Sequence, residues 1–247
     1  IKYYFLFIYT TISFSIIGYI DDMLIVVKKK NDGLAPRKKL MLQILFSIIF
    51  YVLVKFIYED INYIYIPGLE YQLNISYLYM VFVVFWQTGF SNAVNLTDGL
   101  DGLATSVTII TTSTFALLAY KENNFPVFVF CLVLVGALIG FLLFNKNPAK
   151  IFMGDTGSLA LGGILAAISI ILHKEIAFIF IGLVYILETL SVIIQVAYFK
   201  KTGKRIFKMS PLHHHFELSG YGEVKTVYLF VIIDLISSGI GYFLGVI

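Results

Sequence analysis

The sequence predicts an all-α, polytopic integral membrane protein. Of its 247 residues, 59% are hydrophobic, 17% are aromatic and only 13% are charged, whereas ordinary globular domains carry about 25% charged residues. A chain of this length has too little interior to bury that much apolar surface in water. The mean hydropathy of +0.89 therefore points to lipid as the main solvent. Soluble enzymes, disulfide-stapled secreted domains and disordered tails are excluded.

Eight apolar stretches are long enough, or nearly so, for helices that cross a bilayer core of about 30 Å. They lie at residues 3–20, 40–57, 76–94, 103–120, 126–144, 157–173, 176–199 and 226–246. The sixth is the least secure as a lone helix, because it is rich in Gly and Ala, but such small residues suit close approach between helices. No linker separates a second domain, so we expect residues 1–247 to form a single membrane-embedded domain. Because the chain is already apolar at Tyr3, we expect its first residues to come from the middle of a longer protein.

Basic residues are concentrated in three segments between the predicted helices. The segments contain Lys28, Lys29, Lys30, Arg37, Lys38 and Lys39; Lys146 and Lys150; and Lys200, Lys201, Lys204, Arg205, Lys208 and Lys225. Eight alternating helices put all three on one side, which the positive-inside rule makes cytoplasmic. The segment from Glu59 to Ser76 then lies outside, where the alternation of Ile61, Tyr63 and Tyr65 predicts a short strand or hairpin ending at Pro67-Gly68.

The predicted cytoplasmic side also gathers acidic residues. Asp21-Asp22 ends the first span, and alone it reads equally well as a solvated helix cap. Asp98 and Asp101, in Asn95-Leu96-Thr97-Asp98-Gly99-Leu100-Asp101-Gly102, are three residues apart and can face one direction on a helical turn. Hard oxygen ligands of this kind favour Mg²⁺ or Mn²⁺ over Zn²⁺. The alternative is an N-terminal capping loop.

Two further segments carry groups suited to phosphate. In Phe152-Met153-Gly154-Asp155-Thr156-Gly157-Ser158, an acid between glycines opens a span, so its amides form a helix N-terminus that favours anions. Phe152 could stack on a planar base, and the alternative is a simple capping turn. The triplet His213-His214-His215 follows a basic run; three successive side chains cannot all face one way, but imidazoles donate to phosphate oxygens and base carbonyls. The alternative is a surface run without function.

Carboxylates for a divalent cation, basic groups for phosphates and an open membrane flank describe phosphoryl transfer at the bilayer surface. The motifs resemble those of the polyprenyl-phosphate N-acetylhexosamine-1-phosphate transferases. The resemblance rests on Gly18 to Asp22, Asn92 to Ala104, Phe152 to Ser158 and Pro211 to Glu217, in the family's order. The form Pro-Leu-His-His-His-Phe-Glu points to the branch that acts on phospho-N-acetylmuramoyl-pentapeptide.

The resemblance implies a fold of ten transmembrane helices that dimerises and holds its site in a cytoplasmic cleft of the bacterial inner membrane. The eight predicted spans would be the last eight, because the family's first two helices and its Thr-Pro-Thr-Met-Gly-Gly segment have no counterpart in this sequence. The implied reaction transfers phospho-MurNAc-pentapeptide from its UDP carrier to undecaprenyl phosphate, giving lipid I and UMP. No nucleic-acid partner is expected.

The resemblance also implies roles for individual residues. Asp155 would bind Mg²⁺, with Asp98 close to the metal or phosphate, and Asp21 and Asp22 would handle the lipid phosphate or the metal. The residues on the substrate side would be Lys39, Asn95, Asp101, Phe152, Gly154, Gln195, His213, His214 and His215. The family pattern Asp-Asp-x-x-Lys is broken at Ile25, and Lys28, Lys29 or Lys30 would have to substitute. Which aspartate acts as the base, and whether a covalent intermediate forms, stays open.

Two alternatives remain at this point. One is a GlcNAc-1-phosphate transferase, which has the same chemistry and a different donor. The other is a transporter whose acids line a pathway. Transporters place such charges near the membrane midplane, and here only Glu188 and Asp234 are expected well inside spans, where a helix–helix hydrogen bond is the simpler explanation.

Overall fold

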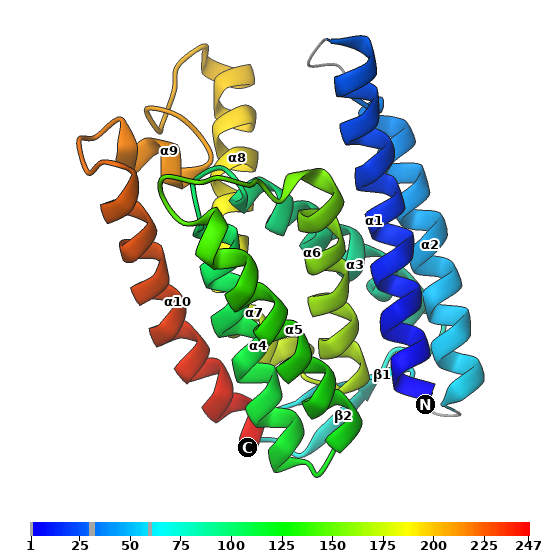
Figure 1. Ribbon diagram of the computed structural model, residues 1–247. Helices are drawn as coiled ribbons and strands as arrows, with labels where there is room; N and C mark the ends of the chain where they lie inside the picture. The colour runs from blue at the N-terminus through cyan, green and yellow to red at the C-terminus, as the bar shows by residue number, and fades with distance from the viewer. Residues whose placement is uncertain (1, 30–32, 59–60) are drawn as a thin grey trace.

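The computed structural model describes residues 2–29, 33–58 and 61–247. Lys30 and Glu59, named above, lie outside the described residues. The elements are α1 (Lys2–Lys28), α2 (Pro36–Ile57), β1 (Tyr63–Ile66), β2 (Tyr71–Asn74), α3 (Leu78–Thr97), α4 (Leu103–Lys121), α5 (Phe125–Asn145), α6 (Gly154–Ile171), α7 (Glu175–Ile181), α8 (Leu183–Thr202), α9 (Leu212–Glu217) and α10 (Glu223–Val246). The all-α membrane fold is therefore confirmed, with one small hairpin added (Figure 1).

Helix α6 is the most buried of the candidate spans. Within its most apolar stretch, 78% of the residues are buried, against 17% in α5. Glycines allow its neighbours to come this close. A Cβ on Gly18 of α1 would lie 2.1 Å from the backbone oxygen of Asp155, and one on Gly162 would lie 2.2 Å from that of Phe90 in α3. The sixth span, the least secure in the sequence, is thus a central helix, and its small residues serve close packing as expected.

The number of spans differs from the sequence-based count. Seven helices of the described chain are long and apolar enough to cross a membrane. Helix α3 is not among them, because its inner half carries polar residues such as Gln87, Asn92 and Asn95. The span predicted at 176–199 is divided at Gly182 into α7 and α8. The count of eight therefore stays a prediction.

The two ends of the helix bundle have different characters. The predicted outer hairpin is confirmed: β1 and β2 pair antiparallel, with Tyr63 opposite Asn74 and Ile66 opposite Tyr71. It lies at the same end as both chain termini, and α9 lies at the other end (Figure 1). Helix α1 runs eight residues beyond its predicted span, so Asp21 and Asp22 lie within its last two turns, away from the hairpin.

Candidate active site

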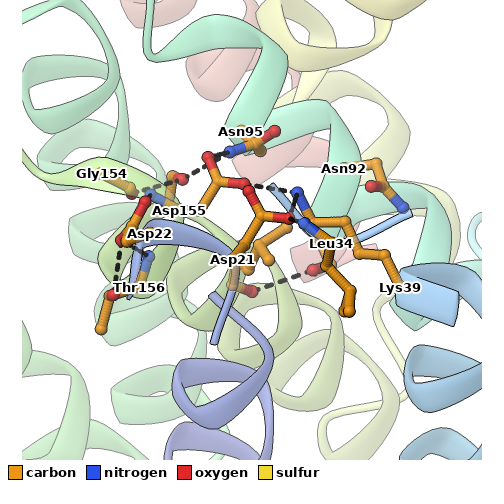
Figure 2. A network of polar contacts seen from close by, with 12 residues as sticks. Asp21, Asp22, Leu34, Lys39, Asn92, Asn95, Gly154, Asp155 and Thr156 are labelled. Atoms are coloured by element: carbon orange, nitrogen blue, oxygen red, sulfur yellow. Dashed lines mark hydrogen bonds and ion pairs between the residues drawn. The ribbon is translucent and has the colours of Figure 1, made fainter. Parts of the chain in front are cut away.

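Three carboxylates from two helices meet at the end of the bundle away from the hairpin. Asp21 and Asp22 come from α1, and Asp155 comes from the first turn of α6. Each offers a ligand oxygen, and the three oxygens lie within 4.8 Å of one another. They come together because α1 and α6 cross closely at Gly18. Figure 2 shows the three side chains converging from the two helices.

Asp22 caps the N-terminus of α6 from a different helix. Its Oδ1 accepts a hydrogen bond from the backbone N–H of Asp155 at 3.2 Å, and its Oδ2 accepts from the N–H of Thr156 at 3.0 Å and from the Thr156 hydroxyl at 2.6 Å (Figure 2). These N–H groups have no partner within the helix, and a negative charge is favourable there. Gly154 has φ +62°, and a Cβ at this position would lie 2.9 Å from Asp22 Oδ2. Asp22 thereby fixes the backbone that carries Asp155.

Asp155 is held between a cation and an amide. The Lys39 ammonium of α2 forms a short ion pair with its Oδ2, and the Asn95 amide of α3 donates to its Oδ1 at 2.7 Å. Lys39 also lies 3.6 Å from Asp21, whose Oδ1 accepts the Leu34 N–H at 2.8 Å. Partners from α2, α3 and the loop at Leu34 therefore converge on the carboxylates of Asp155 and Asp21.

The cluster fits a hard divalent cation. Three carboxylates supply oxygen ligands from a fixed backbone, and the single cysteine, Cys131, is buried in α5, away from the cluster. Such donors suit Mg²⁺ or Mn²⁺. Lys39 offsets part of the repulsion between the carboxylates of Asp21 and Asp155.

Asp98 lies beside the cluster, just beyond the end of α3. Burial, together with the neighbouring charges of Asp155 and Asp22, raises the pKa of its carboxyl to about 6. A group whose pKa lies near neutrality can both accept and release a proton. Asp98 is also adjacent to Gly99, where a Cβ would lie 2.3 Å from His213 Nε2. The histidine segment thus packs directly against the loop that carries Asp98.

Asp101 belongs to a different network. Its Oδ2 accepts hydrogen bonds from the Ala149 N–H at 2.8 Å and from the Asn147 amide at 3.3 Å, and its backbone N–H donates to Glu223 at 2.8 Å. Asn147 also donates to Glu223 at 2.9 Å. Asp101 therefore joins the loops after α3 and α5 to the start of α10. A substrate-binding role for Asp101 stays a prediction.

Each histidine of the triplet has its own orienting partner. His213 is buried, with its Nδ1 3.2 Å from a carboxylate oxygen of Glu188. His214 Nδ1 lies 2.8 Å from Glu217, and His215 Nδ1 accepts the Lys208 N–H at 3.1 Å. The neutral His215 ring must then carry its proton on Nε2, which makes that nitrogen a donor. As expected, the three rings do not share one direction.

Two predicted substrate residues are placed very differently. Gln195 is engaged by the loop after α8: its amide oxygen accepts the N–H groups of Ile206 and Phe207, both at 3.0 Å, and its amide nitrogen donates to the Phe207 carbonyl at 2.9 Å. It therefore shapes that loop. Phe152 is 76% exposed, so its ring is available for stacking. Both substrate-binding roles stay predictions.

Three partners were missed by sequence reasoning. Thr156 donates its hydroxyl to Asp22, Glu188 accepts a hydrogen bond from the backbone N–H of His213, and Glu217 lies 2.8 Å from His214 Nδ1. The spacing of His214 and Glu217, three residues apart, was a usable signal for a pair on one helical turn. The other two contacts join distant parts of the chain and left no local signal. Glu188 bonds to His213 rather than lining a pathway, which removes one motivation for a transporter.

The fold is that of a multi-pass membrane protein with an acidic site at one end of its helices, and comparison with known proteins shows that it is a transferase. Residues 4–173 match the model described as glycosyl transferase family 4. The phospho-N-acetylmuramoyl-pentapeptide-transferase of Staphylococcus carnosus is 54% identical over 246 residues, which cover 98% of this chain and 76% of that relative. The enzymes of the same name from Staphylococcus saprophyticus and Staphylococcus aureus are also 54% identical, with the same coverage. The chain belongs to glycosyl transferase family 4, and it is a multi-pass protein of the bacterial cell membrane.

Proposed function

We propose that the protein transfers phospho-MurNAc-pentapeptide from UDP-MurNAc-pentapeptide to undecaprenyl phosphate, releasing UMP and forming lipid I. The observation that carries the proposal is the cluster of Asp21, Asp22 and Asp155 around Lys39, in a chain that is 54% identical to transferases of that name. A phosphate oxygen of the lipid attacks the sugar-linked phosphorus, and the bond from that phosphorus to the UMP oxygen breaks. The negative charge on the reacting phosphates is what the site must balance.

Mg²⁺, or Mn²⁺ in its place, would be held by Asp155 with Asp21 as the second ligand. When bound, it would neutralise charge on the phosphate oxygens and on the leaving group. Asp22 keeps the Asp155 backbone in place through its three hydrogen bonds. Asn95 fixes the rotamer of the Asp155 carboxylate, so the ligand oxygens are oriented before substrate arrives.

Asp98 is the proposed proton acceptor. Its pKa of about 6 lets it take the remaining proton of the lipid phosphate near neutral pH, which makes the attacking oxygen a better nucleophile. The reaction then needs no covalent enzyme intermediate. Lys39 lies beside the same carboxylates and would contact the incoming phosphate.

The uridine end of the donor is assigned to the exposed ring of Phe152 and to the histidine segment. Phe152 offers a face for stacking, and His215 presents an Nε2 donor. We assign this end of the bundle to the cytoplasm, because the basic segments gather there and a nucleotide donor is made in that compartment. A homodimer is proposed from the family resemblance.

Donor specificity tests the proposal. Membranes that contain the protein are incubated with undecaprenyl phosphate and either UDP-MurNAc-pentapeptide or UDP-GlcNAc, and the release of UMP is measured. We expect release with the first donor and at most background with the second. UMP from UDP-GlcNAc alone would establish a GlcNAc-1-phosphate transferase, and release from neither donor would contradict the proposal.

A further inference from the structure

Burial sets His213 apart from the other histidines of its segment. The side chain of His213 is 1% exposed, whereas that of His214 is 30% exposed. A ring that solvent does not reach cannot bind a water-soluble nucleotide while it stays in this position. The substrate contact that the family resemblance implies for His213 is therefore not open to it, and no step of the proposed reaction involves His213 or Glu188.

Glu188 of α8 holds His213 at two points. Its Oε1 accepts the backbone N–H of His213 at 3.2 Å, and its Oε2 lies 3.2 Å from the ring Nδ1. The Glu188 side chain is completely buried, and a carboxylate in such a place is costly unless it is paired. These two contacts tie α9 to α8 and hold both the backbone and the ring of His213.

The far edge of the ring rests on Gly99, in the loop after α3. A Cβ on Gly99 would lie 2.3 Å from Nε2, 2.8 Å from Cε1 and 3.3 Å from Cδ2 of His213. The φ angle of Gly99 lies outside the left-handed region, so the backbone alone would accept an L side chain here. Glycine is needed at this position because the imidazole occupies the space of a side chain.

The position of the Asp98 side chain depends on the same loop, because Gly99 follows Asp98 directly. Among the described residues, no side chain and no backbone N–H donates a hydrogen bond to the Asp98 carboxylate. The backbone at residues 98 and 99 therefore sets where this carboxylate lies beside the cluster. That backbone in turn rests on the ring of His213.

We propose that His213 is a positioning residue for the reaction, which acts through Gly99 on the proton acceptor Asp98, and that Glu188 holds it in place. This inference rests on the proposed function and deepens it, because it separates one histidine of the segment from substrate binding. A small displacement of a reacting group slows the reaction without removing a substrate contact. Loss of His213 should thus change kcat and leave the affinity for both substrates unchanged.

The first test measures the steady-state constants of His213→Ala by UMP release, with each substrate varied in turn. The substitution keeps the backbone N–H that Glu188 accepts, so the segment retains that anchor. We expect kcat to fall roughly a hundredfold and both KM values to stay within about threefold of wild type. A wild-type kcat would overturn the proposal, and so would a KM for UDP-MurNAc-pentapeptide raised about tenfold or more, which would make His213 a substrate ligand.

A double variant tests whether His213 acts through Gly99. Gly99→Ala should lower kcat, because its methyl group collides with the ring, whereas Gly136→Ala in α5, where nothing lies within 4 Å, should not. Without the ring the collision disappears, so Gly99→Ala combined with His213→Ala should have a kcat within about threefold of His213→Ala alone. Multiplication of the two losses would show that the residues act independently and would refute the route through Gly99.

A conservative variant tests the role of Glu188. Glu188→Gln keeps an oxygen that can accept the His213 N–H, so its kcat should stay within about threefold of wild type. Glu188→Ala leaves that N–H without an acceptor and should lower kcat roughly tenfold. Equal kcat values for the two variants would count against Glu188 as the residue that holds His213.

Thermal unfolding in detergent with EDTA tests the contact independently of turnover. Gly99→Ala should lower the melting temperature of the otherwise wild-type protein and have little effect on that of His213→Ala. Equal shifts in both backgrounds would refute the contact. The expected difference, in a protein that releases no UMP, would instead contradict only the proposed reaction.

Discussion

Removing the Asp22 side chain should destabilise the protein even when no metal is present. Asp22→Ala deletes the acceptor of three hydrogen bonds at the N-terminus of α6. Loss of an N-cap acceptor costs about 0.5–2 kcal/mol, and loss of a partly buried negative charge at a helix N-terminus costs up to about 2 kcal/mol more. The variant should therefore lose roughly 1–4 kcal/mol of stability.

Two milder variants should lose less stability than Asp22→Ala. Asp22→Asn keeps one acceptor oxygen and loses the charge, which should cost about 1–2 kcal/mol. Thr156→Val removes only the hydroxyl hydrogen bond, at a cost of about 1 kcal/mol. Thermal unfolding in detergent with EDTA should rank Asp22→Ala below both. An Asp22→Ala protein that melts at the wild-type temperature in EDTA would refute the capping role and leave Asp22 as a metal ligand only.

Three other variants test separate parts of the account. Gly18→Ala should lower both the melting temperature and activity, because its Cβ would collide with the Asp155 backbone; Gly140→Ala in α5, where nothing lies within 4 Å, should not, and equal melting of the two would argue against the close crossing. The pKa of Asp98, at about 6, lies above its ordinary 3.8, so the folded protein disfavours the ionised carboxylate. The free energy of unfolding therefore falls as the pH rises from about 4 to about 6. In EDTA, Asp98→Asn should thus stabilise the protein above pH 6 by at most about 3 kcal/mol and change little below pH 4; an effect that does not vary with pH would be inconsistent with this shift. Phe152→Ala should raise the KM for the nucleotide with no change in melting temperature, because the ring is 76% exposed, and an unchanged KM would remove Phe152 from the nucleotide site.

Much of the architecture was predictable because lipid imposes simple rules on sequence. The length of the apolar stretches located the helices, and the alternation of apolar side chains located the hairpin at Tyr63–Asn74. The break at Gly182 was not predicted, because the apolar run continues through it and only packing divides the helix. Helix α3 was counted among the spans because of its length, although polar residues on it make contacts inside the bundle, such as the hydrogen bond from the Asn92 amide to Gln43 at 3.0 Å.

The candidate site was predictable in its residue types and not in its contacts. Five aspartates were expected to surround one cleft on the cytoplasmic side: Asp21, Asp22, Asp98, Asp101 and Asp155. Asp21, Asp22 and Asp155 do lie together, and their charges act on Asp98, whereas Asp101 accepts hydrogen bonds from Asn147 and Ala149. The cap that Asp22 provides for α6 spans more than 130 residues of sequence, and no local pattern encodes such a contact. Gln195 was assigned to substrate from the resemblance, while its hydrogen bonds go to the loop at Ile206 and Phe207.

Metal-dependent phosphoryl transfer at the carboxylate cluster predicts that UMP release depends on both Mg²⁺ and the Asp155 carboxylate. Membranes with wild type, Asp155→Asn or the control Glu70→Gln, in the hairpin turn at the far end, are assayed with UDP-MurNAc-pentapeptide, with Mg²⁺ and then with EDTA. We expect wild type and Glu70→Gln to be active with Mg²⁺ and inactive in EDTA, and Asp155→Asn to be inactive in both, since its amide loses the charge that holds a cation against two phosphates. Full activity in EDTA, or a wild-type rate for Asp155→Asn, would contradict the account.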